Sequence, residues 1–425
     1  MAIETRPKVV IIGAGFGGLW AARRIAQTRA DVLLIDRNNY HTFFPLPYQV
    51  AAAELEPEDI IYPVRSILNK YSNIQFLLGE VTGIEFSQRK VNIGNQSIPY
   101  DYLILSVGSK PLFFGVDGAV EHALPLRTLD EAVLLRNHIL CRFEAASYET
   151  DQALRQQMLT FTIVGGGSTG VEYAGALAEL VRVPLRRDYP NLDFSQVHIL
   201  LLEASRRLLT GTPERLHQYA YMHLMQMGVE VQLNSPVSQI TSQAVILKDG
   251  RVIPTETLVW TAGLGGVDLA RNWGFQTRSN GQVNVLPTLQ VENHPDIYIV
   301  GDLAHVEQDG QPLQLIATVA IQEGEWAAKN VRRQIAGQHP EPFQYHDPGM
   351  LAVIGRNAAA VRLGHYTFIG FPAWVIWVAV HLYRLIGFRN RLFVLVNWAL
   401  DYIFYNRVER LITPLPEREL SKRGC

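Results

Sequence analysis

Two glycine-rich turns, each directly after an apolar run, constrain this chain more than any other feature of its sequence. The first, Gly13-Ala-Gly15-Phe-Gly-Gly18, follows the run Val9–Ile12, and the second, Gly165-Gly-Gly167-Ser-Thr-Gly170, follows the run Thr160–Val164. A short continuous apolar run that ends in glycine is typical of a buried parallel strand. The chain therefore repeats one strand–turn–helix unit, which predicts an α/β fold with two Rossmann-like dinucleotide-binding domains.

The first turn matches the dinucleotide fingerprint G-x-G-x-x-G, and a helix is expected next, over residues 18–30. The three glycines have different roles, because Gly13 makes the tight turn, Gly15 lets the backbone approach a pyrophosphate, and Gly18 lets helix and strand pack closely. The N-terminus of the helix then stabilises the phosphate charge. Asp36 closes the next expected strand, where its carboxylate can accept hydrogen bonds from a ribose.

The second turn repeats these roles with Gly165, Gly167 and Gly170, and Glu203 closes the strand that follows. A carboxylate pairs with free ribose hydroxyls but repels a 2'-phosphate, which favours NADH over NADPH. Arg206 and Arg207 have two interpretations, as solvated or phosphate-steering residues of a loop or as readers of a 2'-phosphate.

The segments between and after the fingerprints follow the same α/β pattern. We expect a helix over Ser168–Arg182, a loop over Val183–Gln196 and a charged helical connection over Leu129–Leu159. Lys90–Ile98 and Ala244–Ile253 have the alternation and turn residues of β-hairpins. Strands and helices that alternate in this way indicate parallel sheets.

Two dinucleotide sites in one chain imply a reaction between two nucleotides, most simply hydride transfer from a nicotinamide to a flavin. FAD is then the retained cofactor and NADH the visiting substrate. Glu172 comes two residues after Gly170, which we interpret as the first turn of the helix beside the second dinucleotide. Its carboxylate either complements the helix dipole or contacts the nicotinamide end of NADH, and we count it as a candidate catalytic residue.

Composition excludes several other classes of function. The 425 residues are too many for one ordinary domain, and a formal net charge of -2 gives no basic field for nucleic acid. The two cysteines, Cys141 and Cys425, lie in no metal-ligand or CxxC spacing, so we expect no metal, no iron–sulfur cluster and no redox-active cysteine pair. The N-terminus has no apolar signal segment, so the protein is expected to stay where it is made.

Further segments extend the pattern. Gly301-Asp302 ends an apolar run, Gly263 closes the run Leu258–Ala262, and the stretch Asp36–Val50 is rich in aromatics and proline. Together with the two fingerprints, these segments resemble the two-dinucleotide-binding flavoprotein superfamily and, within it, the type II NADH:quinone oxidoreductases. The resemblance implies that Gly301 and Asp302 bind FAD, that Gly263 belongs to the NADH domain, and that Asp36–Val50 packs against FAD.

The resemblance also implies a quinone site at a motif that reads Ala-Gln-x-Ala-x-Gln in this family. Here the matching residues are Ala317, Thr318, Ala320 and Gln322, so threonine replaces the first glutamine. Ala317 would open a helix whose N-terminus stabilises a reduced flavin, and Gln322 would line the approach of the quinone. The alternative interpretation is that Gln322 is an ordinary glutamine on a helix surface, with no role in quinone binding.

The C-terminal region is aromatic and locally basic. The run Phe371–Tyr383 is too short to cross a bilayer, and Leu392–Asn406 is apolar except for Asn397, Asp401 and Tyr405, which recur at i+4 and predict one polar face. Three tryptophans suit a headgroup boundary: Trp374, Trp377 and Trp398. From Arg384 onward, eight Lys and Arg stand against four Asp and Glu, which favours anionic lipid.

These patterns predict amphipathic helices that lie on a bilayer surface through residues 371–410, and this stretch looks like the membrane-anchoring segment of the same family. The alternative use of the same apolar surface is a homodimer interface or a pair of core helices. We therefore expect a monotopic, peripheral membrane protein on the cytoplasmic side, with NADH and a membrane quinone as its partners.

The predicted reaction is FAD-dependent oxidation of NADH with two-electron reduction of a quinone, by a ping-pong mechanism and without proton pumping. The alternatives are an NAD(P)H reductase of a naphthoquinone biosynthetic intermediate and a flavoprotein redox sensor. The predicted domain ranges are 1–125 and 287–340 for the two parts of the FAD-binding domain, 126–158 for a connecting helix, 159–286 for the NADH-binding domain, and 341–425 for the C-terminal membrane-anchoring region.

Overall fold

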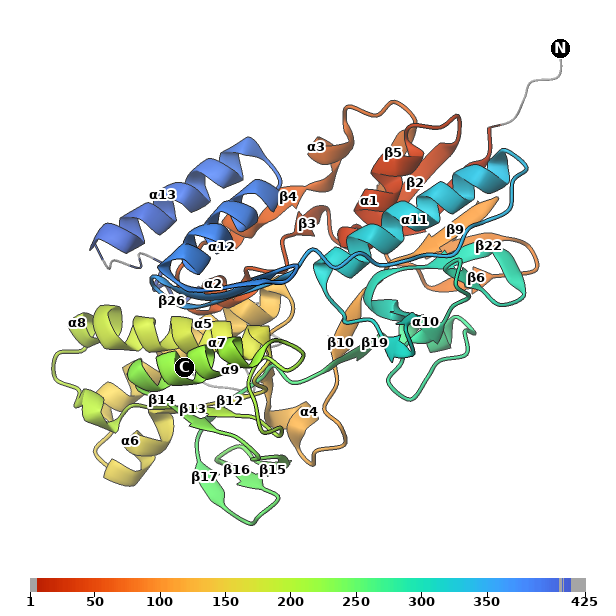
Figure 1. The fold of residues 1–425 in the computed structure, drawn as a ribbon. Coiled ribbons are helices and arrows are strands. Elements are labelled where there is room, and N and C mark those ends of the chain that lie inside the picture. Colours follow the sequence, from red (N-terminus) through yellow and green to blue (C-terminus); the bar gives the residue numbers. More distant parts are fainter. Residues whose placement is uncertain (1–5, 405–406, 408, 414–425) are drawn as a thin grey trace. The chain divides into compact units, whose positions relative to one another are not determined.

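The computed structural model describes residues 6–404, 407 and 409–413, and these form two compact units (Figure 1). The first unit consists of Met1–Thr42, Ile61–Leu112 and Leu264–Asp347. The second consists of Phe43–Ile60, Phe113–Gly263 and Pro348–Cys425. Each unit contains one of the two glycine fingerprints.

The first unit is built on a six-stranded sheet whose middle strand is the apolar run before the first fingerprint. Its order is β21 (Gln290–Val291), β22 (His294–Ile299), β9 (Tyr102–Leu105), β1 (Lys8–Ile12), β2 (Asp31–Asp36) and β5 (Ile74–Leu78). All pairs are parallel except β21 with β22. Val9, Val10 and Ile11 are fully buried because β1 is paired on both edges within a covered sheet. The predicted parallel strand is confirmed.

Two helices of the first unit pack tightly along one another. α1 spans Phe16–Ile25, so it begins two residues before the predicted start and ends five residues before the predicted end, and α11 spans Ala317–Ile335. A side chain at Gly324 of α11 would place its Cβ 2.1 Å from the carbonyl oxygen of Gly17 in α1. The two backbones can therefore approach only because both positions lack side chains.

The smaller elements of the first unit include the predicted hairpin, which is confirmed as β7 and β8. They are β3 (Tyr40–Thr42), β4 (Ile61–Pro63), α3 (Val64–Leu68), β6 (Gly83–Glu85), β7 (Lys90–Ile93), β8 (Gln96–Pro99), β10 (Ser109–Pro111), β19 (Leu264–Gly266), α10 (Leu269–Asn272), β20 (Val283–Asn284), η4 (Gly301–Leu303), β23 (Ala304–His305), β24 (Glu307–Gln308) and β25 (Gln311–Pro312).

The second unit repeats the architecture around the second fingerprint. Its five parallel strands are ordered β11 (Leu124–Pro125), β18 (Thr257–Trp260), β12 (Thr160–Val164), β13 (His198–Leu202) and β14 (Val229–Gln232). The smaller elements are α2 (Pro47–Ala51), η1 (Pro57–Ile60), α4 (Ala119–His122), β15 (Val237–Ile240), β16 (Ala244–Leu247), β17 (Val252–Pro254) and α9 (Glu214–Gln226). The predicted hairpin is β16 with β17, and the internal duplication is confirmed.

The predicted helical connection is two helices, α5 (Leu129–Tyr148) and α6 (Gln152–Met158). Thr128 begins α5 with a capping box, in which its hydroxyl accepts from the Glu131 N–H and the Glu131 carboxylate accepts from the Thr128 N–H. The α5 helix is more than a charged connector, because it also buries apolar residues such as Phe143 against the unit.

One predicted loop is largely helical. α7 spans Ser168–Leu180 and continues through a π turn, Val181–Leu185, into α8 (Arg186–Asp188), and only then does the chain reach the short helix η3 (Phe194–Gln196). The loop expected over Val183–Gln196 is therefore wrong for its first half. A π turn accommodates Pro184, which removes one backbone donor, without ending the helix.

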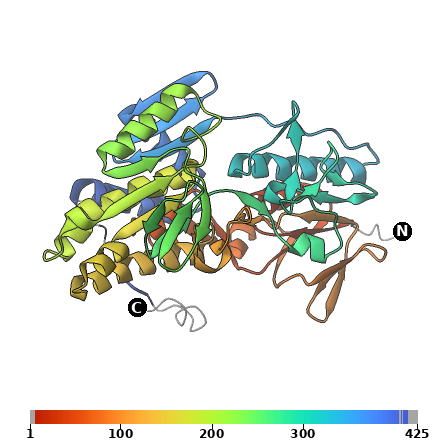
Figure 2. The same cartoon turned by 90° about the horizontal axis from the view of Figure 1, so that it is seen from below.

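The C-terminal part of the second unit contains a sheet that the sequence patterns did not predict. Its strands are β26 (Met350–Gly355), β27 (Ala358–Leu363) and β28 (Tyr366–Gly370), and Figure 2 shows them in blue beside green helices of the unit. Two helices follow, α12 (Phe371–Arg384) and α13 (Phe388–Phe404). Within the described residues, no helix is long and apolar enough to cross a membrane.

The contact between α7 and β26 gives a first testable prediction. A Cβ at Gly175 of α7 would lie 1.7 Å from the carbonyl oxygen of Ile354 in β26, so Gly175→Ala forces helix and sheet apart. We expect a loss of about 1–3 kcal/mol in the free energy of unfolding, measured by thermal or urea denaturation. Gly167→Ala is the matched control, because no atom lies within 4 Å of its added Cβ. Equal stability of both variants would contradict the packing described here.

Candidate active site

The first fingerprint forms an open cradle beside a carboxylate. A Cβ at Gly18 would lie 1.8 Å from the carbonyl oxygen of Gly13, whereas no atom lies within 4 Å of a Cβ at Gly15. Helix and turn are therefore in direct contact at Gly18, and space is left at Gly15 for a pyrophosphate. Asp36 accepts hydrogen bonds from the N–H groups of Ala14 at 2.6 Å and Asn38 at 2.7 Å. Burial raises the pKa of Asp36, and these two bonds oppose the rise.

The Gly301-Asp302 turn is held by a buried acid that sequence reasoning missed. Gly301 has φ 71°, and its N–H donates to the Glu323 carboxyl group at 2.5 Å. Burial raises the pKa of Glu323 well above its usual value, because a charged carboxylate is poorly solvated there. The available signal was an acidic residue on the buried face of α11, which needs a partner. Ser109 also donates to Asp302 at 2.6 Å and fixes that carboxylate.

A buried histidine lies next to the first turn. The Nδ1 atom of His41 is 2.8 Å from the carbonyl oxygen of Ala14, and its Nε2 atom is buried with no hydrogen-bond partner among the described residues. Burial lowers the pKa of His41 to about 4, so the ring is neutral at pH 7. Nδ1 then donates to Ala14, and Nε2 is left as an acceptor. Such an unpaired polar atom beside the cradle fits a bound cofactor that supplies a donor.

The first residues of α11 match the Ala-Gln-x-Ala-x-Gln motif, with Thr318 in place of the first glutamine. No side chain caps this helix at Ile316, so the N–H groups of its first turn, which begins at Ala317, can face an anionic group. The Thr318 hydroxyl is 3.0 Å from the Tyr345 hydroxyl. Gln322 donates to the carbonyl oxygen of His346 at 2.8 Å and accepts from its N–H at 3.0 Å. Gln322 is therefore no ordinary surface glutamine, because both ends of its amide hold the segment before β26.

The second fingerprint has the same construction as the first. A Cβ at Gly170 would lie 1.8 Å from the carbonyl oxygen of Gly165, and a Cβ at Gly167 would meet no atom within 4 Å. Glu203 accepts from the N–H groups of Gly166 at 2.6 Å and Ser205 at 2.7 Å. Asp36 plays the same part in the first unit, because each acid accepts a hydrogen bond from a backbone N–H of the glycine turn beside it.

The arginines after Glu203 differ from one another. Arg207 pairs with Glu214 at 2.7 Å, and both side chains are about half exposed. Such a surface pair contributes little to stability, but it draws Arg207 toward α9. Arg206 is exposed. Three residues after the end of β18 at Trp260, Gly263 has φ 76°, a conformation that favours glycine.

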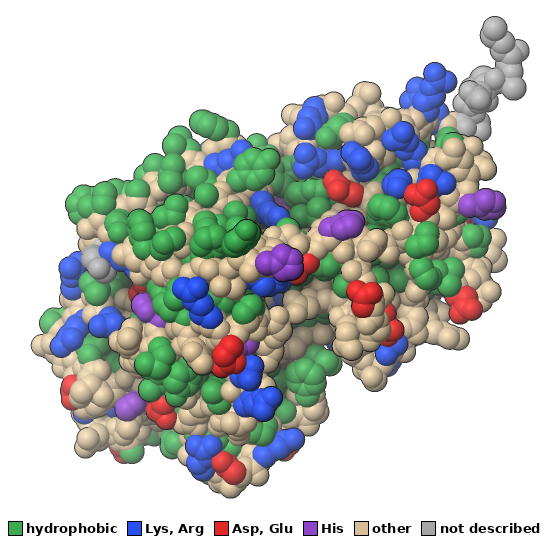
Figure 3. All heavy atoms as spheres, in the orientation of Figure 1, with side chains coloured by type: hydrophobic (Ala, Val, Ile, Leu, Met, Phe, Trp, Pro, Cys, Tyr) green, Lys and Arg blue, Asp and Glu red, His purple; other side chains and the backbone are tan. Residues whose placement is uncertain are grey.

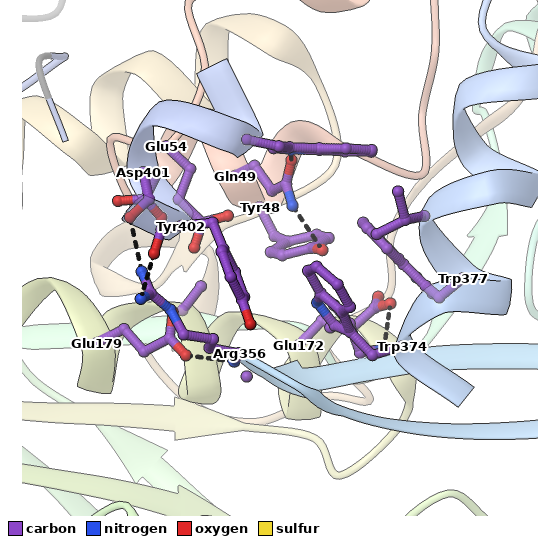
Figure 4. Close-up of a pocket in the computed structure, with 15 residues that line it drawn as sticks. Tyr48, Gln49, Glu54, Glu172, Glu179, Arg356, Trp374, Trp377, Asp401 and Tyr402 are labelled. Carbon is purple, nitrogen blue, oxygen red and sulfur yellow. Dashed lines mark hydrogen bonds between the residues drawn. The ribbon is translucent and has the colours of Figure 1, made fainter. Parts of the chain in front are cut away.

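Glu172 lies beside a small cavity of the second unit (Figure 4). It is the fifth residue of α7, and the first turn of this helix holds no acid, so the prediction of a first-turn acid that complements the dipole is wrong. Its carboxyl group is buried and accepts a long bond, 3.3 Å, from the Val353 N–H of β26. Burial raises the pKa of Glu172 to about 8, against smaller opposing effects of Val353 and the Trp377 indole. Glu172 is therefore protonated at neutral pH.

The residues present fit two nucleotides, one in each unit. The residues predicted to bind FAD (Gly13, Gly15, Gly18, Asp36, Gly301, Asp302 and Ala317) belong to the first unit, together with Gln322. Those predicted to bind NADH (Gly165, Gly167, Gly170, Glu203 and Gly263) belong to the second, together with Glu172. No group of three metal-ligating side chains is found in the described part of the chain.

Comparisons with known proteins agree with this construction. Residues 7–324 match the family model of pyridine nucleotide-disulphide oxidoreductases. The type II NADH:quinone oxidoreductase Ndh of Mycobacterium tuberculosis is 37% identical over 96% of this chain and 90% of its own length. The chain belongs to the type II NADH:quinone oxidoreductases.

The likeness extends to solved structures and to other organisms. The structure of NDH2 from Plasmodium falciparum in complex with NADH superimposes with a TM-score of 0.87 at 19% identity, over 96% of this chain and all of the other. A probable NADH dehydrogenase of Dictyostelium discoideum is 30% identical over 93% of this chain and 90% of its own length. As a member of this family, the chain is an FAD-dependent NADH:quinone oxidoreductase.

The Glu203 carboxylate gives a testable prediction of cofactor choice. Glu203→Gln removes the charge that repels a 2'-phosphate but keeps a side chain that can bond the turn. We expect the preference for NADH over NADPH, measured as the ratio of their kcat/KM values, to fall by about tenfold, which is about 1.4 kcal/mol. Glu230→Gln, an exposed acid on β14, is the control. An unchanged preference would mean that the ribose is read elsewhere.

Proposed function

We propose that NADH binds the second unit with its ribose on Glu203, reduces FAD held by the first unit, and leaves before a membrane quinone takes the electrons. The observation that carries this proposal is the pair of equivalent cradles, each with an acid bonded to its own turn. A single nucleotide site would not support transfer between two nucleotides. The five domain ranges predicted from the sequence remain a prediction within this scheme.

When bound, FAD would accept a hydride and store its two electrons. The residues of the chain orient and stabilise it. The first-turn N–H groups of α11 favour negative charge near Ala317, and Asp302, to which Ser109 donates, would accept hydrogen bonds from the cofactor. Glu323 holds the Gly301 turn, and burial raises the pKa of its carboxyl group, which favours the neutral form there. No proton pumping is expected, because the reaction needs only the protons that quinol formation consumes.

We propose that Gln322 and Thr318 lie on the approach of the quinone. Threonine is shorter than the family glutamine, and its hydroxyl is paired with the Tyr345 hydroxyl. This pair supports a site for a quinone headgroup, and it also keeps the naphthoquinone-reductase alternative testable. Glu172 is proposed as a catalytic acid because it is buried, protonated and on the helix that follows the NADH fingerprint.

The outer surface of α12 and α13 supports membrane docking. Hydrophobic side chains gather over these helices in Figure 3. The outer apolar face consists of exposed residues from both helices: Phe371, Val375, Phe388, Leu392, Phe393, Leu395, Val396, Leu400, Ile403 and Phe404. A patch of this kind is rare on a soluble monomer. We propose that it rests on a lipid surface on the cytoplasmic side, with a homodimer interface as the competing use.

The structure shows which side of α13 packs against the rest of the second unit. Asn397 donates to the Asp59 carboxylate at 2.8 Å, and Trp398 donates to Gln49 at 3.0 Å. The predicted polar face therefore packs into the unit, and the apolar face is the one exposed. Tyr405, the third residue of that predicted face, lies outside the described residues.

Two further expectations for this region change. Trp377 is only 2% exposed and stacks on His381, so it cannot reach a headgroup boundary. Arg407 is buried among carboxylates, so it does not attract lipid, while the basic residues after 413 lie outside the described part. Docking through this region therefore depends more on apolar area than on charge.

Turnover with a panel of acceptors tests the function. We expect rapid, FAD-dependent NADH oxidation only when a quinone is added, with many turnovers per enzyme and slower use of NADPH. Benzoquinones and naphthoquinones of graded tail length, each measured with NADH and NADPH, identify donor and acceptor together. Stoichiometric reduction of the flavin without turnover would instead support a redox sensor. A strict requirement for one naphthoquinone would support the biosynthetic reductase.

The docking surface is tested by point substitutions, because deleting the region would also remove buried groups such as Trp377 and Arg407. Phe393→Asp combined with Leu400→Asp places two charges on the outer apolar face. We expect at least a tenfold loss of binding to phosphatidylglycerol–phosphatidylcholine vesicles in co-sedimentation, since each buried apolar side chain contributes about 1.5–3 kcal/mol.

The control for docking is Tyr148→Asp, which charges an aromatic residue that is 85% exposed on α5. Light scattering of wild type and variants in detergent measures the oligomeric state. Unchanged vesicle binding with conversion of a dimer to a monomer would assign the face to a homodimer interface.

A further inference from the structure

The cavity beside Glu172 separates this acid from a group of three others (Figure 4). Glu172 and Trp377 line one end, and Glu54, Glu179 and Asp401 line the other. The remaining walls are largely aromatic: Tyr48, Trp374, Trp398 and Tyr402. All of these residues belong to the second unit, although they come from four separate stretches of the chain.

The volume of the cavity decides what it can hold. It measures about 70 Å³. A water molecule needs roughly 10–15 Å³ of such space and two or more polar partners, whereas a cavity of about 150 Å³ holds a benzene ring. The cavity is therefore too small for a quinone headgroup, but it has room and polar groups for a few waters in a row.

The far end of the cavity is organised around one buried cation. The guanidinium group of Arg407, 2% exposed, lies 2.6 Å from Glu54 and 2.9 Å from Glu179, with Asp401 at 4.0 Å. It also donates to the carbonyl oxygens of Ala52 at 3.1 Å and Ala176 at 2.7 Å. Arg407 thus has a hydrogen-bond partner on each side, and the three acids are held at fixed positions around it.

The charges at this end do not balance when every acid is ionised. Three carboxylates face Arg407 and Arg356, and the guanidinium group of Arg356 donates to the backbone carbonyls of Asp401 and Tyr402. One carboxylate is therefore in excess, and a proton can reside there. Glu54 is the least exposed of the three acids, with 13% of its side chain exposed against 26% for Glu179 and 23% for Asp401. Burial raises the pKa of Glu54 to about 8, so we assign the proton to Glu54.

The other titratable groups around the cavity are neutral near pH 7. The Tyr48 hydroxyl faces Glu172, Glu54 and Glu179, and burial raises its pKa well above the usual value. It therefore keeps its proton and can donate a hydrogen bond between the two ends, while it accepts one from Gln49 at 3.2 Å. On α9, burial lowers the pKa of His223, the group next to Glu179.

Quinol formation requires one proton that NADH does not bring. A quinone gains two electrons and two protons, and NADH transfers two electrons and one proton as a hydride. The balance is NADH + H⁺ + quinone → NAD⁺ + quinol. One proton per turnover must therefore come from water.

We propose that Glu54, gathered with Glu179 and Asp401 around Arg407, is a proton-uptake site that passes this solvent proton through the cavity to Glu172. The proposal rests on the proposed function of Glu172 as the acid that serves the quinone. Glu179 and Asp401 reach solvent, with side chains 26% and 23% exposed. The proton moves from water to Glu54, and the waters of the cavity and the Tyr48 hydroxyl carry it to Glu172, which has donated its own proton. No charge crosses a membrane in this step.

The test compares Glu54→Gln with wild type in the two half-reactions of the holoenzyme. Stopped-flow absorbance follows flavin reduction by NADH, and then reoxidation by a water-soluble short-tail ubiquinone or by ferricyanide, which accepts electrons without protons. We expect Glu54→Gln to slow quinone reoxidation by about tenfold or more at pH 8, less at pH 6, and to raise its solvent isotope effect in D₂O. Flavin reduction by NADH and reoxidation by ferricyanide should keep their wild-type rates.

The sign of the pH dependence follows from the raised pKa values. Glu54 and Glu172 hold their protons below about pH 8 and lose them above it, so wild-type quinone reoxidation should fall as pH rises through 8. In Glu54→Asp, which keeps a titratable group, the rate should recover in part. Glu58→Gln changes an exposed acid of the same segment and is the matched control.

Each outcome separates the proposals. Equal slowing with quinone and ferricyanide would overturn the proton-uptake site, because a disturbed structure slows both. Unchanged quinone reoxidation in Glu54→Gln would also overturn it. If wild type itself fails to reduce quinone, the proposed function fails instead. If Glu54→Gln does not fold, Asp401→Asn, at the weakest of the three contacts with Arg407, is measured in the same way, and a wild-type isotope effect there overturns the proposal.

Discussion

In each unit, direct backbone contact between a glycine turn and the helix after it holds the nucleotide cradle in place. A Cβ atom at Gly18 would lie 1.8 Å from the carbonyl oxygen of Gly13, and a Cβ atom at Gly170 would lie 1.8 Å from that of Gly165. Neither position can therefore carry a side chain. The contact brings the helix N-terminus over the carboxyl end of the central strand. It also leaves the middle glycine open and places the acid of the next strand against the turn. Both cradles follow from this one close approach.

Buried acids support these cradles, and burial sets their protonation. Glu323 holds Gly301, and burial raises its pKa. Glu172 and Glu54 keep protons to about pH 8, because a charged carboxylate would be poorly solvated there. Arg407 is stabilised in the opposite way, as a buried cation with acids on two sides. Removing Arg407 from that group would leave Glu54 and Glu179 without the cation that they share.

The orientation of α13 links this buried chemistry to the outer surface. Its polar residues Asn390, Asn397 and Asp401 face the second unit, where Asn390 and Asn397 bond to residues 58 and 59. The helix must then turn its apolar residues outward, which accounts for the large exposed face. The same packing brings Asp401 to Arg407 and Trp398 to the cavity wall, so the docking surface and the cavity share one helix.

Much of the fold and of the nucleotide sites could be predicted from the sequence. The central strands, the fingerprint glycines, Asp36, Glu203 and the Gly301-Asp302 turn are encoded within short stretches, where local backbone geometry demands particular residues. The absence of a cysteine pair after Asp36 also separated this chain from disulfide reductases. These inferences needed no knowledge of how distant segments meet.

Only the tertiary structure decided which side of α13 faces water, where α7 ends, and that Trp377 is buried. It alone brought Glu54, Glu172 and Glu179 to one cavity and placed Arg407 against two of them, because 353 residues separate the partners of one ion pair, Glu54 and Arg407. Amphipathic periodicity shows that a helix has two faces, but not which of them meets the protein. The charge of a buried acid likewise depends on neighbours that the chain supplies only after folding.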